Sequence, residues 1–166
     1  MIGLKIIIFL CVVMAMTNSI IGQNSTFIDE DCFQCLCEGA TGCNSTAGCQ
    51  STYHGAEFCG PFHISWQYWL DAGSPSILDV TKPTFEDFKD CANDFSCAAT
   101  IVRNYLQKLI ISKKVDCNGD GEINCIDFAL THKLGGYNCH QKDDRPTKYY
   151  GRFYACWNNT GSEDYS

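Results

Sequence analysis

The stretch CFQCLCEGATGC, residues 32–43, places four cysteines within twelve positions. Such a density is typical of small extracellular domains that are held together by disulfides. The run CFQCLC could also suggest a zinc site, but an oxidising compartment makes that interpretation poor. We expect this stretch to form a short helix followed by a turn, with its cysteines paired to others in the chain.

Residues 1–22 have the features of a secretory signal peptide. Lys5 supplies positive charge, residues 6–16 form an apolar run, and small or polar residues lead to Gly22. The apolar run is too short for a membrane span, and no later stretch is long enough for one. We therefore expect a secreted, extracellular protein in which residues 23–166 form one domain, with its core at residues 32–157.

Twelve cysteines follow that segment, and an even number behind a signal peptide predicts about six disulfides. Each contributes roughly 2–4 kcal/mol by restricting the unfolded chain. The spacing does not determine which cysteines pair. The twelve are Cys32, Cys35, Cys37, Cys43, Cys49, Cys59, Cys91, Cys97, Cys117, Cys125, Cys139 and Cys156.

The remaining charge is acidic. Without Lys5 the chain carries 11 basic and 19 acidic residues, and no basic stripe indicates a nucleic-acid partner. An acidic chain also gains no electrostatic attraction to anionic bacterial walls. Three N-x-[ST] sequons, at Asn24, Asn44 and Asn158, predict glycosylation at the surface.

The hydrophobic pattern predicts a mainly α fold with a small β-hairpin, an α+β arrangement. Residues 49–64 combine glycines with alternating aromatic residues, as a hairpin does. Thr84 and Asp94 are suited to be helix N-caps, and Gly135 is suited to end a helix. Helices are expected at residues 65–71, 84–91, 94–112 and 124–134.

The stretch DCNGDGEINCID, residues 116–127, matches the twelve-residue loop of an EF-hand. Alternate side chains of such a tight loop point inward, and Gly121 permits its reversal. Asp127 stands where glutamate is usual and is shorter, while Cys117 and Cys125 hold the loop at both ends. We expect a structural calcium ion held by Asp116, Asn118, Asp120, Glu122, Asn124 and Asp127.

The block CGPFHISWQYWLDAG, residues 59–73, resembles a signature of the invertebrate-type lysozyme family, which includes destabilase. CFQCLC, DCANDFSCA and HKLGGYNC match further family blocks, so the resemblance runs from about Cys32 to Cys156. The calcium loop is similar to that of insect members. Two family cysteines are replaced, by Ala72 and Ile101, which implies that these two cysteines pair with each other elsewhere in the family.

The resemblance implies a lysozyme-like fold, a monomer, and bacterial peptidoglycan or a related glycan as partner. The implied reaction hydrolyses the β-1,4 bond between N-acetylmuramic acid and N-acetylglucosamine. It needs one carboxyl group to protonate the leaving oxygen and a second to attack the sugar or stabilise its cation. The family glutamate falls on Ala40. The second carboxylate falls on Thr52 when counted from Cys49, and on Tyr53 when counted back from Gly55.

These replacements predict weak or absent hydrolysis, and a glycan-binding protein of host defence. The alternative is an active digestive or antibacterial muramidase that uses a relocated acid, Glu38 or Glu57. Both glutamates are most simply interpreted as surface charges. In addition, Glu38 is two residues from Ala40 and points to another side of a helix.

A groove without its acids could still bind sugar, since aromatic faces stack on sugar rings and aspartate accepts hydroxyl hydrogens. Taken singly, Trp69 is better explained as a core residue, whereas His63 and Tyr68 are expected at the surface. His132 matches the family histidine before Gly135, and a lone histidine there is more often structural or a binding contact than a base. The predicted groove residues are His63, Tyr68, Trp69, Asp71 and His132.

Overall fold

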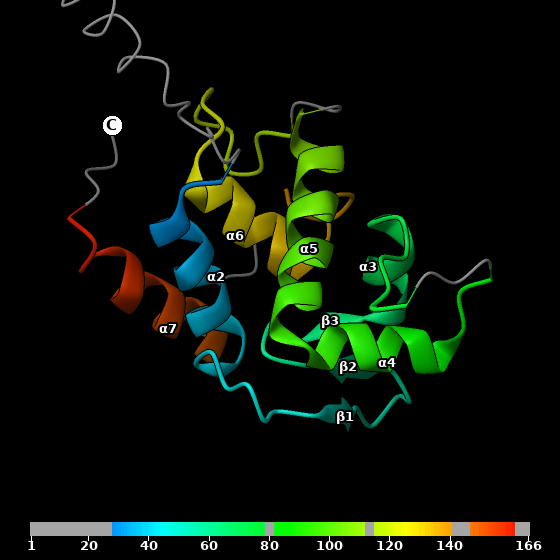
Figure 1. The fold of residues 1–166 in the computed structure, drawn as a ribbon. Helices are drawn as coiled ribbons and strands as arrows, with labels where there is room; N and C mark the ends of the chain where they lie inside the picture. Colours follow the sequence, from blue (N-terminus) through cyan, green and yellow to red (C-terminus); the bar gives the residue numbers. More distant parts are fainter. Residues whose placement is uncertain (1–27, 79–81, 112–114, 141–146, 162–166) are drawn as a thin grey trace, which may run out of the picture.

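The computed structural model describes residues 28–78, 82–111, 115–140 and 147–161; the predicted signal peptide and Asn24 lie outside these ranges. Helices dominate, and a small sheet lies at one end of the molecule (Figure 1). The elements are α2 (Glu30–Thr41), β1 (Cys49–Ser51), β2 (Glu57–Cys59), β3 (Ile64–Ser65), α3 (Trp66–Asp71), α4 (Phe85–Asn93), α5 (Phe95–Leu106), η1 (Gln107–Ile111), α6 (Cys125–Leu134) and α7 (Lys148–Trp157).

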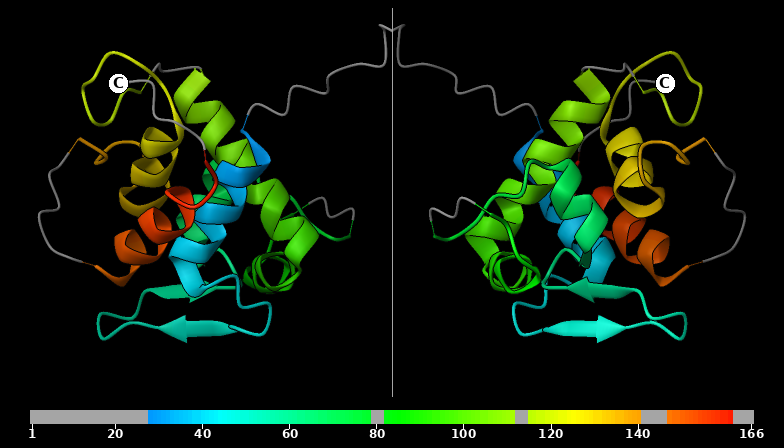
Figure 2. Two further views of the ribbon diagram at one scale, coloured as in Figure 1. Left: turned by 90° about the vertical axis from the view of Figure 1, so that its left-hand side faces the viewer. Right: turned by 90° about the vertical axis from the view of Figure 1, so that its right-hand side faces the viewer.

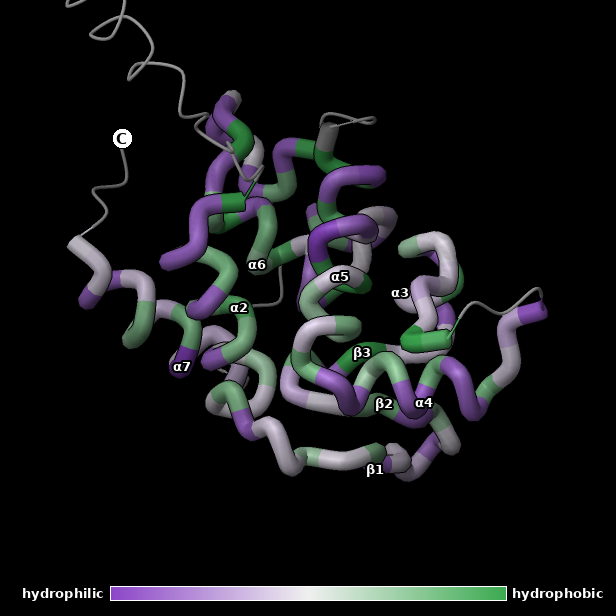
Figure 3. Tube along the Cα trace, viewed as in Figure 1, coloured by the Kyte–Doolittle hydropathy of each residue, from purple (hydrophilic) through white to green (hydrophobic). Residues whose placement is uncertain are grey.

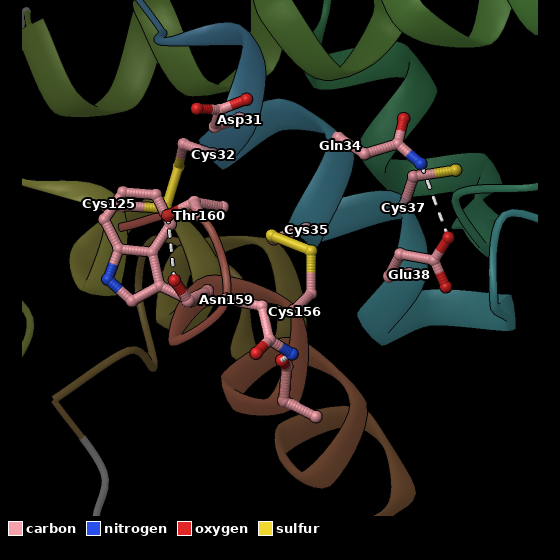
Figure 4. Close-up of a disulfide and its surroundings, with 12 residues drawn as sticks. Asp31, Cys32, Gln34, Cys35, Cys37, Glu38, Cys125, Cys156, Asn159 and Thr160 are labelled. Carbon is pink, nitrogen blue, oxygen red and sulfur yellow. Dashed lines mark hydrogen bonds between the residues drawn. A yellow bond between two sulfur atoms is a disulfide. The ribbon is translucent and has the colours of Figure 1, made fainter. Parts of the chain in front are cut away.

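All twelve cysteines among the described residues form disulfides, which confirms the predicted six and excludes the zinc interpretation of CFQCLC. Two of them join α2 to distant helices: Cys32 pairs with Cys125 of α6, and Cys35 pairs with Cys156 of α7 (Figure 4). The other four are Cys37–Cys43, Cys49–Cys59, Cys91–Cys97 and Cys117–Cys139.

The helix α2 begins and ends by local rules. The Asp29 side chain accepts hydrogen bonds from the first backbone N–H groups, and Gly42 ends the helix in the left-handed conformation. Gly39 faces α7, where an added Cβ would lie 3.0 Å from the Tyr149 ring. The absence of a side chain at Gly39 therefore lets α2 and α7 pack closely, and these two helices lie side by side in both views of Figure 2.

One core joins the helices to the sheet. Phe62, Trp69, Phe88 and Phe153 are among its largest fully buried side chains. Colours alternate along α4 and α5 in Figure 3, as expected for helices with one buried face.

The predicted helix caps are confirmed. Thr84 forms a capping box with Asp87 at the start of α4, and Asp94 caps α5 through the Cys97 N–H. Gly135 ends α6, also as predicted.

Two helical features differ from the prediction. The long helix expected to reach residue 112 is α-helical only to Leu106 and continues as the π-helical η1. The tail also contains α7, a helix that the sequence pattern did not predict. Thr147 caps it, and Tyr149, Phe153 and Trp157 form its buried face. Over the ranges described, we find no helix with the length and apolar character that crossing a membrane requires.

The predicted hairpin is part of a three-stranded antiparallel sheet in the order β1-β2-β3. A tight turn from Gly60 to His63 reverses the chain, with the His63 N–H donating to the Gly60 carbonyl at 3.0 Å. The turn sets Ile64 opposite Cys59, which adds the third strand. His63 itself has a φ of 54°, a left-handed conformation in which histidine is enriched.

Replacing Gly60 with alanine should destabilise the fold by more than about 4 kcal/mol. Gly60 has a φ of 73°, and a Cβ there would overlap the carbonyl oxygen of Ala92 behind the turn. The matched control is Gly55→Ala, since Gly55 has a φ of 79° but nothing within 4 Å of the added Cβ. It should cost only about 1–2 kcal/mol of backbone strain. Urea unfolding of the oxidised proteins measures both, and equal losses would contradict this packing.

Candidate functional site

A cleft of about 690 Å³ lies where the sheet, α3 and the facing ends of α6 and α7 meet. Clefts of this size hold small ligands or part of a polymer. Residues of α2, β2, β3, α3, α5, α6 and α7 contribute to its wall. The lining residues are Ala40, Thr52, Phe58, Phe62, His63, Ser65, Gln67, Tyr68, Asp71, Tyr105, His132, Lys133, Leu134, Gly135, Thr147, Lys148, Tyr149 and Arg152.

Three tyrosines form the floor of the cleft. The rings of Tyr68 and Tyr105 stack with centroids 3.6 Å apart, and Tyr149 donates its hydroxyl hydrogen to the Ala129 carbonyl. Burial raises the pKa of all three hydroxyls, so they keep their protons. Tyr68 is only 9% exposed, so the expectation that it is a surface contact is wrong: it supports the cleft from below.

His132 connects the tyrosine floor of the cleft to the turn at residues 60–63. Its Nδ1 lies 3.0 Å from the Tyr68 hydroxyl, and its Nε2 lies 3.0 Å from the Phe62 carbonyl oxygen. Since that carbonyl only accepts, Nε2 carries the hydrogen and Nδ1 accepts from Tyr68. Burial lowers the pKa of His132 to about 4. The ring is therefore neutral and engaged at both nitrogens, which suits a structural role rather than that of a base.

The rim of the cleft carries the accessible aromatic surface. His63 is exposed, and its ring stacks on Phe58 with centroids 4.7 Å apart. Asp71 is also exposed at the cleft. Trp69, one of the predicted groove residues, does not reach the cleft. It is fully buried, which agrees with its interpretation as a core residue, and it donates its indole N–H to the Pro75 carbonyl at 2.7 Å. A helix as short as α3 gave no pattern to show which of its aromatic residues faces inward.

The two positions on which the resemblance places the family carboxylates, Ala40 and Thr52, both line this cleft. Ala40 contributes from the last turn of α2, which Thr41 fixes by donating its hydroxyl to the Pro61 carbonyl at 2.6 Å. Thr52 contributes from the start of the loop that follows β1, whereas Tyr53 is 99% exposed and lies outside the lining. Counting from Cys49 therefore gives the position that faces the cleft. Among the described lining residues, Asp71 is the only acid.

The two alternative acids lie elsewhere. Glu38 accepts a hydrogen bond from Gln34 on the outer side of α2 and is not part of the cleft (Figure 4). Glu57 lines a neighbouring hollow, which shares Ser65 and Gln67 with the cleft. It also lies near Cys49 and Cys59, but these form a disulfide, so the three side chains cannot hold a metal.

The sequence analysis did not predict that basic residues line the cleft. Lys133 projects from the end of α6, and Lys148 and Arg152 project from the first turns of α7. All three are exposed. The signal that could have found them is the basic and aromatic character of the tail in an otherwise acidic chain.

The loop at residues 116–127 is organised by its own side chains. The Asp116 carboxylate accepts from the N–H groups of Gly119 and Gly121, and Asp120 accepts from that of Glu122. Asp127 is fully buried and accepts from the N–H groups of Cys117, Asn118 and Asn124. Asp127 therefore already caps α6 and fixes the loop entrance, and Cys117 and Cys125 hold both ends through disulfides, as predicted.

The sequons differ in what the structure shows of them. Asn44 and Asn158 are exposed, which leaves room for a glycan. Glycosylation at the three sequons stays a prediction.

A family model described as Destabilase matches residues 29–156, most of the chain. This chain belongs to the destabilase family. Its relatives are invertebrate-type lysozymes: it is 34% identical to "Invertebrate-type lysozyme 3" of Caenorhabditis elegans over 68% of this chain and 76% of that protein. It is 28% identical to an invertebrate-type lysozyme of Ruditapes philippinarum over 74% of this chain and 77% of that protein.

Solved structures of lysozymes share the fold of this destabilase-family chain. The crystal structure of Tapes japonica lysozyme matches with a TM-score of 0.59 and 25% identity, over 82% of this chain and 94% of that one. Meretrix lusoria lysozyme in complex with Aeromonas hydrophila PliI matches with a TM-score of 0.58 and 26% identity, over 77% and 89%. The mainly helical, disulfide-rich, lysozyme-like fold expected from the sequence is thereby confirmed.

The buried state of His132 predicts a pH-dependent stability. Because its pKa falls from 6.5 in the unfolded chain to about 4 in the folded one, the neutral ring stabilises the fold fully above pH 6.5. This contribution should be lost as the pH falls from 6.5 towards 4, by up to about 3 kcal/mol. The variant His132→Gln keeps a donor for Phe62 and an acceptor for Tyr68 but does not titrate.

Urea unfolding at pH 7 and pH 4 measures this contribution. Carboxylates titrate equally in both proteins, so the wild type should lose more free energy of unfolding than His132→Gln over this interval. The same loss in both proteins would show that His132 is not held in its neutral form.

Proposed function

We propose that this chain is a secreted invertebrate-type lysozyme homologue that binds peptidoglycan or a related glycan in its cleft and hydrolyses it weakly or not at all. The observation that carries this proposal is the presence of a single carboxylate, Asp71, among the described residues of the cleft. Its six disulfides suit an oxidising, extracellular setting, and we propose a role in host defence.

The chemistry of glycoside hydrolysis explains why one carboxylate is insufficient. A protonated acid must reach the leaving oxygen, while a second carboxylate stabilises or attacks the sugar from the other side. Ala40 has no group that donates a proton, and the hydroxyl of Thr52 carries no charge. Loss of general acid catalysis alone costs about 10²- to 10⁴-fold in rate.

The remaining cleft keeps what binding needs. The tyrosine floor is rigid, because its hydroxyls are engaged with His132, the Gly136 N–H and the Ala129 carbonyl. The exposed His63 ring, backed by Phe58, offers a face for a sugar ring. Exposed Gln67 and Asp71 offer hydrogen-bonding groups for hydroxyls.

An active enzyme with a relocated acid is the second candidate, and Glu57 is its better-placed residue. Its hollow adjoins the cleft at Ser65 and Gln67, whereas Glu38 lies on the outer side of α2. If this candidate is correct, the wild type lyses cells and Glu57→Gln abolishes lysis, while Glu38→Gln does not.

We also propose that the loop at residues 116–127 binds calcium. The side-chain oxygens of Asp116, Asn118 and Asp120 are held in place by hydrogen bonds from backbone N–H groups of the loop. Glu122 is exposed. These are the hard oxygen donors that calcium prefers, and the three N–H groups on Asp127 leave one of its four lone-pair sites available, on Oδ2. When bound, the ion would neutralise the acidic loop and stabilise the start of α6.

Restoring the two carboxylates should create or greatly increase lysis. In the double variant Ala40→Glu, Thr52→Asp the acids return to positions that face the same cleft, so the turbidity of a peptidoglycan suspension should clear at least about a hundredfold faster than with the wild type. The matched control is Gln50→Glu, Tyr53→Asp, which adds two acids at exposed positions outside the cleft. Fast clearing by the wild type, or no gain in the double variant, would overturn the proposal.

Calcium should raise the melting temperature of the oxidised protein. At a calcium concentration about a hundred times Kd, binding to the folded state alone adds about 2.7 kcal/mol. The variant Asp120→Asn removes one charged donor and should lose most of the shift, whereas Asp90→Asn, exposed on α4, should keep it. Equal melting temperatures with calcium and with a chelator would show that the loop binds no calcium.

A further inference from the structure

The charge of the cleft is opposite to that of the chain. The sequence has 19 acidic and 12 basic residues, yet the described lining of the cleft carries Lys133, Lys148 and Arg152 against Asp71 alone. A concave site lined by one sign of charge concentrates the field and attracts ligands of the opposite sign. An acidic protein that gathers cations in its ligand cleft is therefore suited to an anionic ligand.

The three cations line the part of the cleft to which α6 and α7 contribute. Lys148 and Arg152 are four residues apart on α7, so they share one face of the helix. Tyr149 lies between them in sequence, and the Lys133 ammonium lies 5.6 Å from the centre of its ring. Like charges at this helical spacing repel by a few tenths of a kcal/mol, a cost that a bound anion would remove.

Nothing described in the protein neutralises these cations. The ion pairs among the described residues are Lys89–Glu86 and Arg103–Glu30, both away from the cleft. The His63 imidazole responds to this positive charge. Burial is the larger cause of its lowered pKa, and the charge of Lys133 lowers that pKa further. Acids at positions 40 and 52 would offset this charge, but Ala40 and Thr52 do not.

We propose that the cleft binds an anionic saccharide, with a carboxylate or sulfate of the sugar among Lys133, Lys148 and Arg152 and a sugar ring against the Phe58–His63 pair. This inference rests on the proposed function, because it names the class of glycan that the cleft takes. Arginine and lysine side chains in such a cluster form charge-assisted hydrogen bonds to either group.

Calorimetry with three hexasaccharides of equal length tests the proposal on the full oxidised chain. The neutral probe is chitohexaose, the carboxylate probe is a hyaluronan hexasaccharide, and the sulfate probe is a heparin-type hexasaccharide. At least one anionic probe should bind about tenfold or more tightly than chitohexaose, and added salt should reduce the difference. Which anionic probe binds better distinguishes carboxylate from sulfate recognition.

The variant Lys148→Gln, Arg152→Gln should lose the preference, because each charged hydrogen bond that is lost costs about tenfold in affinity. The control Lys82→Gln, Lys89→Gln removes the same charge at residues outside the cleft and should keep it. All four positions are exposed or half-buried, so both variants should fold, and their melting temperatures check this.

Three results would overturn the proposal in different ways. If chitohexaose binds as tightly as the anionic probes, the anionic preference is wrong while glycan binding stands. If both variants lose the preference equally, the net charge of the chain and not the cleft selects the ligand. If no probe binds, this inference fails, and a pull-down of the oxidised protein on purified peptidoglycan then decides whether the proposed glycan-binding function stands.

Discussion

The attachment of α2 to α6 and α7 is the constraint on which the rest of the structure depends. Cys32–Cys125 and Cys35–Cys156 close segments of 93 and 121 residues, so each removes about 5 kcal/mol of chain entropy from the unfolded state in the loop-closure model. Gly39 then lets α7 approach α2 closely. These contacts bring together segments from both ends of the described chain.

The cleft is a consequence of this attachment. The end of α2 places Ala40 in the wall and, through the Thr41 hydroxyl, holds the Gly60–His63 turn. That turn presents the Phe62 carbonyl to His132, and His132 in turn positions Tyr68. The same packing brings Lys148 and Arg152 of α7 to the cleft. The chain therefore keeps a lysozyme-like scaffold, in which Asp71 is the only carboxylate among the described lining residues of the cleft and three cations accompany it.

Local signals in the sequence were sufficient for several elements. The caps Thr84 and Asp94 and the terminator Gly135 act within a few residues, and the structure confirms all three. The pairing of cysteines could not be predicted, because it depends on how distant helices pack. The third strand, Ile64–Ser65, was missed because two residues show no alternation and only the preceding turn sets their register.

The cleft was predictable in part. The resemblance to family blocks located Ala40, Thr52, His63, Asp71 and His132, which all line it. Trp69 was misplaced because α3 is a single short helix in which neighbouring aromatic residues face different sides. The helix α7 was missed although Tyr149, Phe153 and Trp157 recur every four residues behind Thr147, and with it the basic residues of the cleft. Their meeting with α6 depends on tertiary packing.

The central claim is that this lysozyme-like cleft lacks the pair of carboxylates that hydrolysis requires. Counting the new reducing ends that the oxidised wild-type protein releases from purified peptidoglycan tests it most directly, with Tapes japonica lysozyme as the reference. The account predicts a rate at least about a hundredfold below that of the reference. A rate within tenfold of the reference would contradict it.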